Sequence, residues 1–187
     1  SFNTNKITWK EILATKADVK LDKPGFTHWF TDAFTKTLFS ICYRFRVRGN
    51  KKLPKTPCII VANHRSALDG LLITYNFSHK INKDIFFFAK EKHWRSKIAQ
   101  FFARKNNIIL MDINKNVRQS LQEMCAVLKK GKNIVIFPEG TRSKDNNMRK
   151  FKETFAILSK ELNVPIVPVA IAGSESACYG SSIVPKF

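Results

Sequence analysis

The chain has 187 residues, 44% hydrophobic and 25% charged, a composition typical of one globular domain with a single core. Its 33 Lys and Arg against 14 Asp and Glu give a net charge of +19, which requires an anionic partner: nucleic acid, an anionic membrane surface, or a phosphorylated or otherwise acidic substrate. No stretch approaches the roughly 18 to 20 apolar residues of a spanning helix, and the N-terminus resembles no signal peptide, so membrane attachment is expected to be peripheral.

Residues 1–24 are polar, rich in lysine and without a clear period, which predicts an arm or an interdomain linker. The domain itself is predicted to span residues 25–187. We expect the chain to be a fragment of a longer protein, truncated at its C-terminus.

Between Phe26 and Ile41 the apolar residues recur at helical spacing, which predicts an N-terminal amphipathic helix. Farther along, short and nearly all-apolar runs alternate with longer helical or polar segments, and we expect these runs to be buried strands at 58–62, 85–89, 108–111, 134–137 and 166–171. A helix beginning at Val117 is predicted to end before Gly131. The alternation predicts an α/β fold with a mostly parallel sheet covered by helices.

Four cysteines, Cys42, Cys58, Cys125 and Cys178, lie far apart without paired spacing, which predicts reduced thiols in a cytosolic protein. The cysteines and the four histidines do not cluster at ligand spacing, so no metal and no cofactor are expected.

His64 and Arg65 follow the first predicted strand, where ligands gather in open α/β sheets, and Asp69 comes shortly after them. The spacing of His64 and Asp69 is weak evidence by itself, because His79 and Asp84 repeat it with no supporting residues around them.

Two compatible interpretations of this stretch are open. In the structural one, Ser66 caps a helix and Asp69 completes a capping box worth about 1 kcal/mol, while His64 is a turn residue. In the catalytic one, Asp69 folds back, binds one ring nitrogen of His64 and leaves the other nitrogen to take a proton from a hydroxyl.

A second predicted strand ends in Glu139, Gly140, Thr141, Arg142 and Ser143. Gly140 permits a tight turn, and Arg142 offers a planar fork suited to a phosphate monoester. The hydroxyls of Thr141 and Ser143 add donors, whereas Glu139 repels a phosphate unless it binds a hydroxyl or holds the arginine in place. The alternative is an ordinary turn with a surface arginine.

Together, NHRSALD at 63–69, FPEGTRS at 137–143 and VPIVPVAI at 164–171 resemble, in order and spacing, the glycerolipid acyltransferase family, whose best-known members acylate lysophosphatidic acid. The resemblance implies that His64 and Asp69 are the catalytic HxxxxD pair. It implies that the acceptor is bound by Arg65, Ser66, Lys90, Glu139, Gly140, Thr141, Arg142 and Ser143. Lys90 is otherwise one of many solvated lysines.

The chain departs from the family pattern at Asp112, which is followed by Ile113 where the family usually has an arginine. Arg65 and Ser66 look more like glycerol-3-phosphate acyltransferases, whereas FPEGTRS looks more like lysophosphatidate enzymes. The stretches EKHWR, ILMDINK, GKNIVIFPEGTRSKD and TFAILSKELNVPIVPVAI look most like acyltransferase domains fused to an acyl-CoA or acyl-carrier-protein synthetase.

The resemblance therefore implies transfer of an acyl group from acyl-CoA or acyl carrier protein to a lysophospholipid, foremost 1-acyl-glycerol-3-phosphate, at the cytoplasmic side of an anionic membrane. The alternatives are a glycerol-3-phosphate or other lysophospholipid acyltransferase, or a noncatalytic membrane-binding module. The helix at 26–41 and the amphipathic stretch at 90–105 are candidates for membrane contact, although either could pack on the core instead. Nucleic acid is not expected, because the basic residues are dispersed and no binding motif appears.

Overall fold

The computed structural model describes residues 9–14, 19–42, 46–49, 52–111, 117–142 and 147–174. Within these ranges one parallel sheet has the strand order β3-β2-β4-β1-β5. Its strands are β1 (Ile59–Ala62), β2 (Ile85–Lys90), β3 (Ile108–Met111), β4 (Asn133–Ile136) and β5 (Ile166–Val169). Each strand overlaps a predicted apolar run, with ends that differ by up to two residues, and the predicted α/β class is confirmed.

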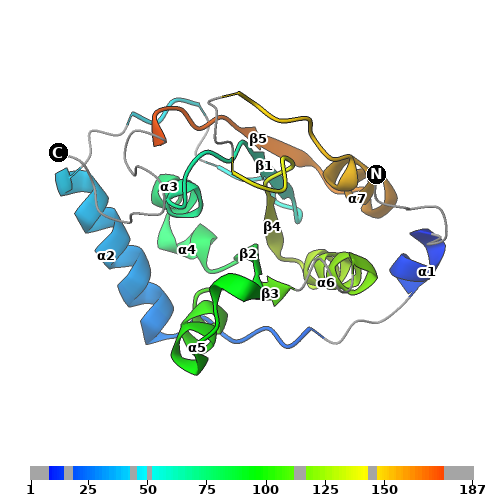
Figure 1. The fold of residues 1–187 in the computed structure, drawn as a ribbon, viewed down its shortest axis with the longest axis horizontal. Coiled ribbons are helices and arrows are strands. Elements are labelled where there is room, and N and C mark those ends of the chain that lie inside the picture. The colour runs from blue at the N-terminus through cyan, green and yellow to red at the C-terminus, as the bar shows by residue number, and fades with distance from the viewer. Residues whose placement is uncertain are drawn as a thin grey trace.

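Helices cover both sides of this sheet (Figure 1). They are α1 (Trp9–Ala14), α2 (Phe26–Cys42), α3 (Asp69–Asn76), α4 (His79–Asn82), α5 (Lys97–Lys105), α6 (Val117–Lys129) and α7 (Thr154–Leu162), with a short 3-10 helix, η1 (Glu91–His93). In Figure 1, α2, α3 and α4 lie on one side of the sheet and α1, α6 and α7 on the other, and α5 lies beside β3. The predicted helices at 26–41 and from Val117 are confirmed by α2 and α6.

Strand β1 lies between these two layers, and all four of its residues are buried. Ile59 and Val61 belong to the core cluster that includes Leu128 of α6 and Leu158 of α7, whereas Ile60 and Ala62 belong to the cluster on the side of α3 and α4. Because side chains alternate along a strand, a strand covered on both faces is apolar throughout, which is why its position could be predicted.

The predicted arm contains buried residues. Ile12 of α1 is 1% exposed and Val19 is 8% exposed, and both belong to the core cluster on the α6 side. The Nζ atoms of Lys129 and Lys130 donate to the backbone oxygens of Leu13 and Val19. The described part of residues 1–24 is therefore packed on the domain, and the boundary after residue 24 stays a prediction.

The stretch at 90–105 is not one helix. Lys90 ends β2, η1 follows it, and α5 begins at Lys97. Ser96 determines this start, because its side chain accepts a hydrogen bond from Ala99 N at 3.1 Å and so caps the helix.

Strand β5 forms one edge of the described sheet, and Pro168 lies within it. The backbone oxygen of Pro165 accepts from Ile59 N at 3.0 Å, so this residue faces β1. Successive residues of a parallel strand turn their backbone polar groups to alternate sides, which places Ile166 and Pro168 toward the outer edge.

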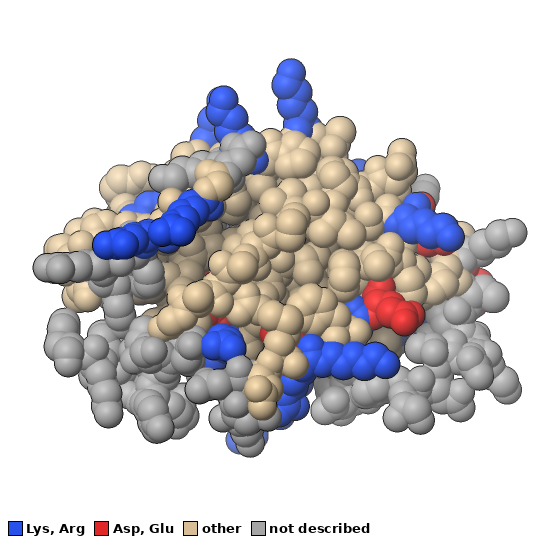
Figure 2. All heavy atoms as spheres, turned by 90° about the horizontal axis from the view of Figure 1, so that it is seen from above, with Lys and Arg blue, Asp and Glu red and all other residues tan. Residues whose placement is uncertain are grey.

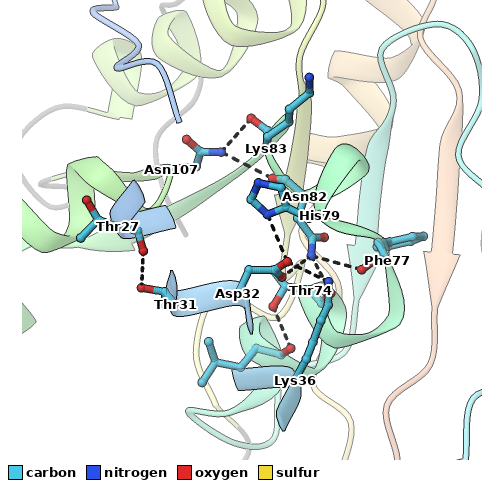
Figure 3. Close-up of polar contacts among 11 residues, drawn as sticks. Thr27, Thr31, Asp32, Lys36, Thr74, Phe77, His79, Asn82, Lys83 and Asn107 are labelled. Carbon is cyan, nitrogen blue, oxygen red and sulfur yellow. Dashed lines mark hydrogen bonds and ion pairs between the residues drawn. The ribbon is translucent and has the colours of Figure 1, made fainter. Parts of the chain in front are cut away.

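Helix α2 is fastened to the domain through Asp32 (Figure 3). Its Oδ1 accepts from Asn82 Nδ2 at 2.7 Å, while its Oδ2 lies 2.8 Å from Lys36 Nζ and 3.2 Å from His79 Nδ1. The ring of His79 packs against that of His28 with 5.3 Å between centroids, and burial, followed by the proximity of His79, lowers the pKa of His28. One carboxylate thus joins α2 to α4.

Asn82 extends this connection to α3. Its Nδ2 also lies 2.7 Å from the backbone oxygen of Thr74 and 3.2 Å from that of Phe77, and the residue is 1% exposed. A buried amide with several acceptors fixes the end of α3 relative to α2.

The opposite side of α2 exposes large apolar side chains, which we call the aromatic face. It consists of Phe26, Trp29, Phe30, Phe34, Leu38 and Ile41. Ile98, Phe101 and Phe102 of α5 are also exposed. Among the helices that the structure describes, none combines the length and the apolarity needed to cross a bilayer.

The Asp32 connection can be tested by unfolding. Asp32→Ala takes an acceptor from the buried Asn82 amide, and we expect it to lower the free energy of unfolding by about 1–3 kcal/mol in urea titrations. Asp22→Ala is the control, because its ion pair with Lys105 joins side chains that are 28% and 33% exposed and is worth only about 0–1 kcal/mol. Equal losses in the two variants would contradict the anchoring role of Asp32.

Candidate functional site

Two loops meet at the carboxyl ends of β1 and β4. These strands are paired in parallel with Val61 opposite Ile136, so the residues that follow them emerge side by side. His64 follows β1 and Glu139 follows β4. The backbone N–H of His64 donates to Glu139 Oε1 at 2.8 Å, which joins the two predicted motifs directly.

The predicted catalytic pair is in contact. The Nδ1 atom of His64 lies 2.9 Å from Oδ2 of Asp69, which is the first residue of α3 and is 0% exposed. The same oxygen accepts the backbone N–H groups of Arg65 at 2.6 Å and Ser66 at 2.8 Å. The acid thus folds back on the loop and also binds the imidazole. The predicted capping box is wrong, because α3 begins at Asp69 with Leu68 as its N-cap and no side-chain cap bond, and Ser66 Oγ accepts from Leu68 N instead.

The environment keeps Asp69 ionised. Burial raises the pKa of its carboxyl, but the hydrogen bond to His64, the N–H of Ser66, the proximity of Ser174 and the N–H of Arg65 together bring this pKa below its ordinary value. An ionised carboxylate only accepts hydrogen bonds, so the Nδ1 of His64 donates and its Nε2 carries a lone pair.

The His64 ring is held from a second direction by Phe137. The two rings stack with 4.2 Å between centroids and 22° between planes. The His64 side chain remains 23% exposed. The imidazole is therefore fixed by a hydrogen bond at Nδ1 and by the ring of Phe137 stacked on its face. It remains partly accessible to solvent.

Glu139 is 5% exposed, and each of its oxygens accepts a hydrogen bond from a backbone N–H group. Its Oε2 accepts from Arg149 N at 3.1 Å, while Oε1 accepts from His64 N. The sequence suggested that this carboxylate would bind a hydroxyl or hold an arginine side chain. In the structure it connects three loop segments through their backbones.

The turn after β4 is tight. Gly140 N donates to Phe137 O at 3.0 Å, and Gly140 has φ +69°, a conformation that L side chains rarely adopt. A Cβ atom at Gly140 would also lie 2.9 Å from the Nζ of Lys152. The backbone N–H of Lys152 donates to Pro138 O. The end of a lysine side chain can move aside, so the need for glycine at this turn rests on the backbone conformation.

The other predicted acceptor residues differ in accessibility. Thr141 and Arg142 are exposed beside the Glu139 turn, whereas Ser66 is 3% exposed and its Oγ accepts from Leu68 N. Lys90 is half-buried at the carboxyl end of β2. Ser143 lies outside the described residues, as do Asp112 and Ile113. The binding roles of all these residues stay predictions.

Asn63 contributes a contact that the sequence analysis did not assign. Its Nδ2 donates to Ile171 O at 2.8 Å and its Oδ1 accepts from Ile171 N at 2.7 Å. This pair of bonds ties the loop after β1 to the segment after β5. Its position directly before His64 was the one available signal, together with an amide side chain that can donate and accept at the same time.

The contact between His64 and Asp69 lies at the centre of the site. Among the described residues no group of His, Cys, Asp and Glu could hold a metal ion. A cavity of about 290 Å³ lies elsewhere, between residues 19–22, α5 and β3, and none of the site residues lines it. On the face in Figure 2, Lys and Arg side chains project at the margins rather than from one patch.

Comparison with known proteins gives consistent matches. The family model "Acyltransferase" matches residues 44–172. A chloroplastic 1-acyl-sn-glycerol-3-phosphate acyltransferase of Brassica napus is 30% identical over 153 residues, which are 80% of this chain and 43% of the relative. A probable 1-acyl-sn-glycerol-3-phosphate acyltransferase of Mycoplasma genitalium is 30% identical over 129 residues, or 67% of this chain and 48% of the relative.

Among solved structures, the 1-acyl-sn-glycerophosphate acyltransferase of Thermotoga maritima matches with a TM-score of 0.62 and 27% sequence identity. The match covers 80% of this chain and 59% of that one. The chain thus spans about half the length of the curated relatives it matches.

The bridging role of Glu139 generates a stability prediction. Glu139→Gln keeps one acceptor oxygen but turns an amide N–H₂ toward a backbone N–H, so we expect a loss of about 1–3 kcal/mol in the free energy of unfolding. Glu161→Gln on the exposed side of α7 is the control and should change it by less than about 0.5 kcal/mol. A variant as stable as wild type would show that the bridge contributes nothing to the fold.

Proposed function

The chain belongs to the acyltransferase family, as its motifs predicted, and on this premise we propose that it moves a fatty acyl group from an acyl thioester to the hydroxyl of a lysophospholipid, foremost 1-acyl-glycerol-3-phosphate. The contact between His64 Nδ1 and Asp69 Oδ2 at 2.9 Å, which leaves Nε2 without a hydrogen bond to any residue that the structure describes, carries this proposal. The names of the relatives from Brassica napus and Mycoplasma genitalium support the choice of acceptor.

In the proposed reaction His64 acts as the general base. Its Nε2 removes the proton of the acceptor hydroxyl while that oxygen attacks the thioester carbonyl. The C–S bond then breaks, and the imidazolium returns the proton to the departing thiolate. Asp69 stabilises the imidazolium in between, because it is ionised and bound to Nδ1.

The acceptor phosphate is proposed to lie beside the Glu139 turn. Arg142 and Thr141 are exposed there, next to the loop that carries His64. A guanidinium fork and a hydroxyl suit a phosphate monoester. Lys90, at the end of β2, is proposed to add positive charge from a neighbouring strand that pairs with β4.

The donor is proposed to be acyl-CoA or acyl carrier protein, both anionic and suited to a chain of net charge +19. A fused acyl synthetase remains a proposal based on the sequence resemblance. The described cysteines Cys42, Cys58 and Cys125 are free thiols, which supports action on the cytoplasmic side of the membrane.

The membrane contact is proposed to be the aromatic face of α2. Phe26 and Ile41 are 76% and 78% exposed, and the opposite side of the helix is fastened to the domain through Asp32. An amphipathic helix with exposed aromatic side chains, on a basic protein, suits the interface of an anionic bilayer.

The reaction is tested by release of free thiol from palmitoyl-CoA, or from palmitoyl carrier protein, with lysophosphatidate, glycerol-3-phosphate or lysophosphatidylcholine as acceptor. We expect acceptor-dependent release that falls by at least about 10²-fold in His64→Ala, because the general base is gone. His79→Ala is the matched control: His79 has the same spacing to an aspartate, but it lies beside Asp32 and should retain activity.

Two outcomes would contradict this mechanism. Equal losses in the two histidine variants would place the effect in the fold rather than in the base. Absence of turnover from a folded wild-type protein that binds vesicles would favour the noncatalytic membrane-binding module instead.

The aromatic face gives a separate prediction. A Phe30→Ser and Phe34→Ser double variant removes side chains that are 53% and 58% exposed, and we expect cosedimentation with phosphatidylglycerol vesicles to weaken by more than about 10-fold. Val117→Ser, on the exposed part of α6, should bind like wild type. Unchanged binding of the double variant would exclude α2 as the membrane contact.

A further inference from the structure

The second carboxylate oxygen of Asp69 has no role in the mechanism above. Oδ2 collects three donors, whereas Oδ1 is buried and has no hydrogen-bond partner among the residues that the structure describes. The hydroxyl of Ser174 is also buried without a hydrogen-bond partner among the described residues, and this residue is 1% exposed. Buried polar groups without partners are rare, and two in one place call for an explanation.

The architecture brings these two groups together. The amide of Asn63 holds Ile171 by two hydrogen bonds, so the chain that continues to Ser174 runs beside the loop that continues to Asp69. Ser174 is also near enough to Asp69 to help lower the pKa of its carboxyl. The hydroxyl is thus close enough to act on the carboxylate as a hydrogen-bond donor, but the pair does not have the geometry of a standard hydrogen bond.

We propose that Ser174 is a positioning residue for Asp69, whose Oδ1 it binds by donating its hydroxyl hydrogen when His64 takes up a proton. The inference rests on the proposed acyl transfer. Ser174 does not touch the substrate and acts only through the carboxylate.

Charge development explains why the bond would tighten during the reaction. When the imidazole gains a proton, an ion pair forms at Oδ2, and the carboxylate must keep its orientation while the charge changes beside it. A donor on Oδ1 fixes the plane of the carboxylate and completes its hydrogen bonding in a buried site. Hydrogen bonds of catalytic groups are often long or misaligned in the absence of substrate and tighten in its presence.

The experiment compares Ser174→Ala with Ser120→Ala, which removes the hydroxyl of another buried serine, located in α6. Thiol release from palmitoyl-CoA with lysophosphatidate should show kcat reduced by about 10-fold in Ser174→Ala with KM unchanged, since one hydrogen bond to a charged group is lost. Ser120→Ala should keep the wild-type kcat. Ser174→Thr, which retains the hydroxyl, should recover part of the rate.

A spectroscopic reading is independent of turnover. The proton on His64 Nδ1, identified by its absence in His64→Ala, reports by NMR on the charge at Asp69 Oδ2. The spectra are recorded in acidic buffer, where the imidazole carries its second proton and the Ser174 bond is proposed to form. There Ser174→Ala removes a donor from Asp69 and leaves more negative charge on Oδ2, so the signal should move downfield, whereas in Ser120→Ala it should not move.

The possible failures are distinguishable. If the wild-type protein has no turnover but Ser174→Ala still moves the His64 signal, the proposed reaction is contradicted and the contact is supported. A Ser174→Ala variant with unchanged signal would overturn the positioning role, and so would one with unchanged kcat. A loss of stability without either effect would leave Ser174 a packing residue only.

Discussion

Three donors meet at one buried oxygen, Oδ2 of Asp69, and the geometry of the site depends on this convergence. A buried carboxylate is costly unless its charge is compensated, so the N–H groups of Arg65 and Ser66 must point inward and the loop after β1 must fold back. That folding brings the imidazole of His64 to the same oxygen as a third donor. The same interaction thus shapes the loop, keeps the acid ionised and sets the tautomer of the base.

Much of this arrangement could be predicted from local patterns. Strands covered on both faces are apolar throughout, and the apolar residues of α2 recur at every third or fourth position. Both patterns could therefore be recognised in the sequence. The spacing of His64 and Asp69 could not distinguish them from His79 and Asp84. In the structure His79 lies beside Asp32, and Asp84 pairs with Lys132. The position of His64 and Asp69 after a central strand, rather than their spacing, distinguishes them from His79 and Asp84.

The remaining contacts involve backbone groups or partners far away in the chain, and no sequence pattern encodes them. Glu139 binds the N–H groups of His64 and Arg149, which every residue type except proline would offer. The stacking of Phe137 on His64 depends on the register of β1 and β4. Such contacts follow from the tertiary fold, so a motif can name a residue such as Glu139 without revealing its backbone contacts. The role of Glu139 in acceptor binding stays a prediction.

Pro168 bears on how the domain behaves in a crowded solution. An unprotected strand at the margin of a sheet can recruit a strand from another molecule, which is a route to aggregation. Proline has no N–H, and in β5 its nitrogen belongs to the side that faces away from β1. A foreign strand approaching the outer side of β5 in the described sheet would find the row of donors interrupted there, so Pro168 discourages extension of this sheet into fibrils.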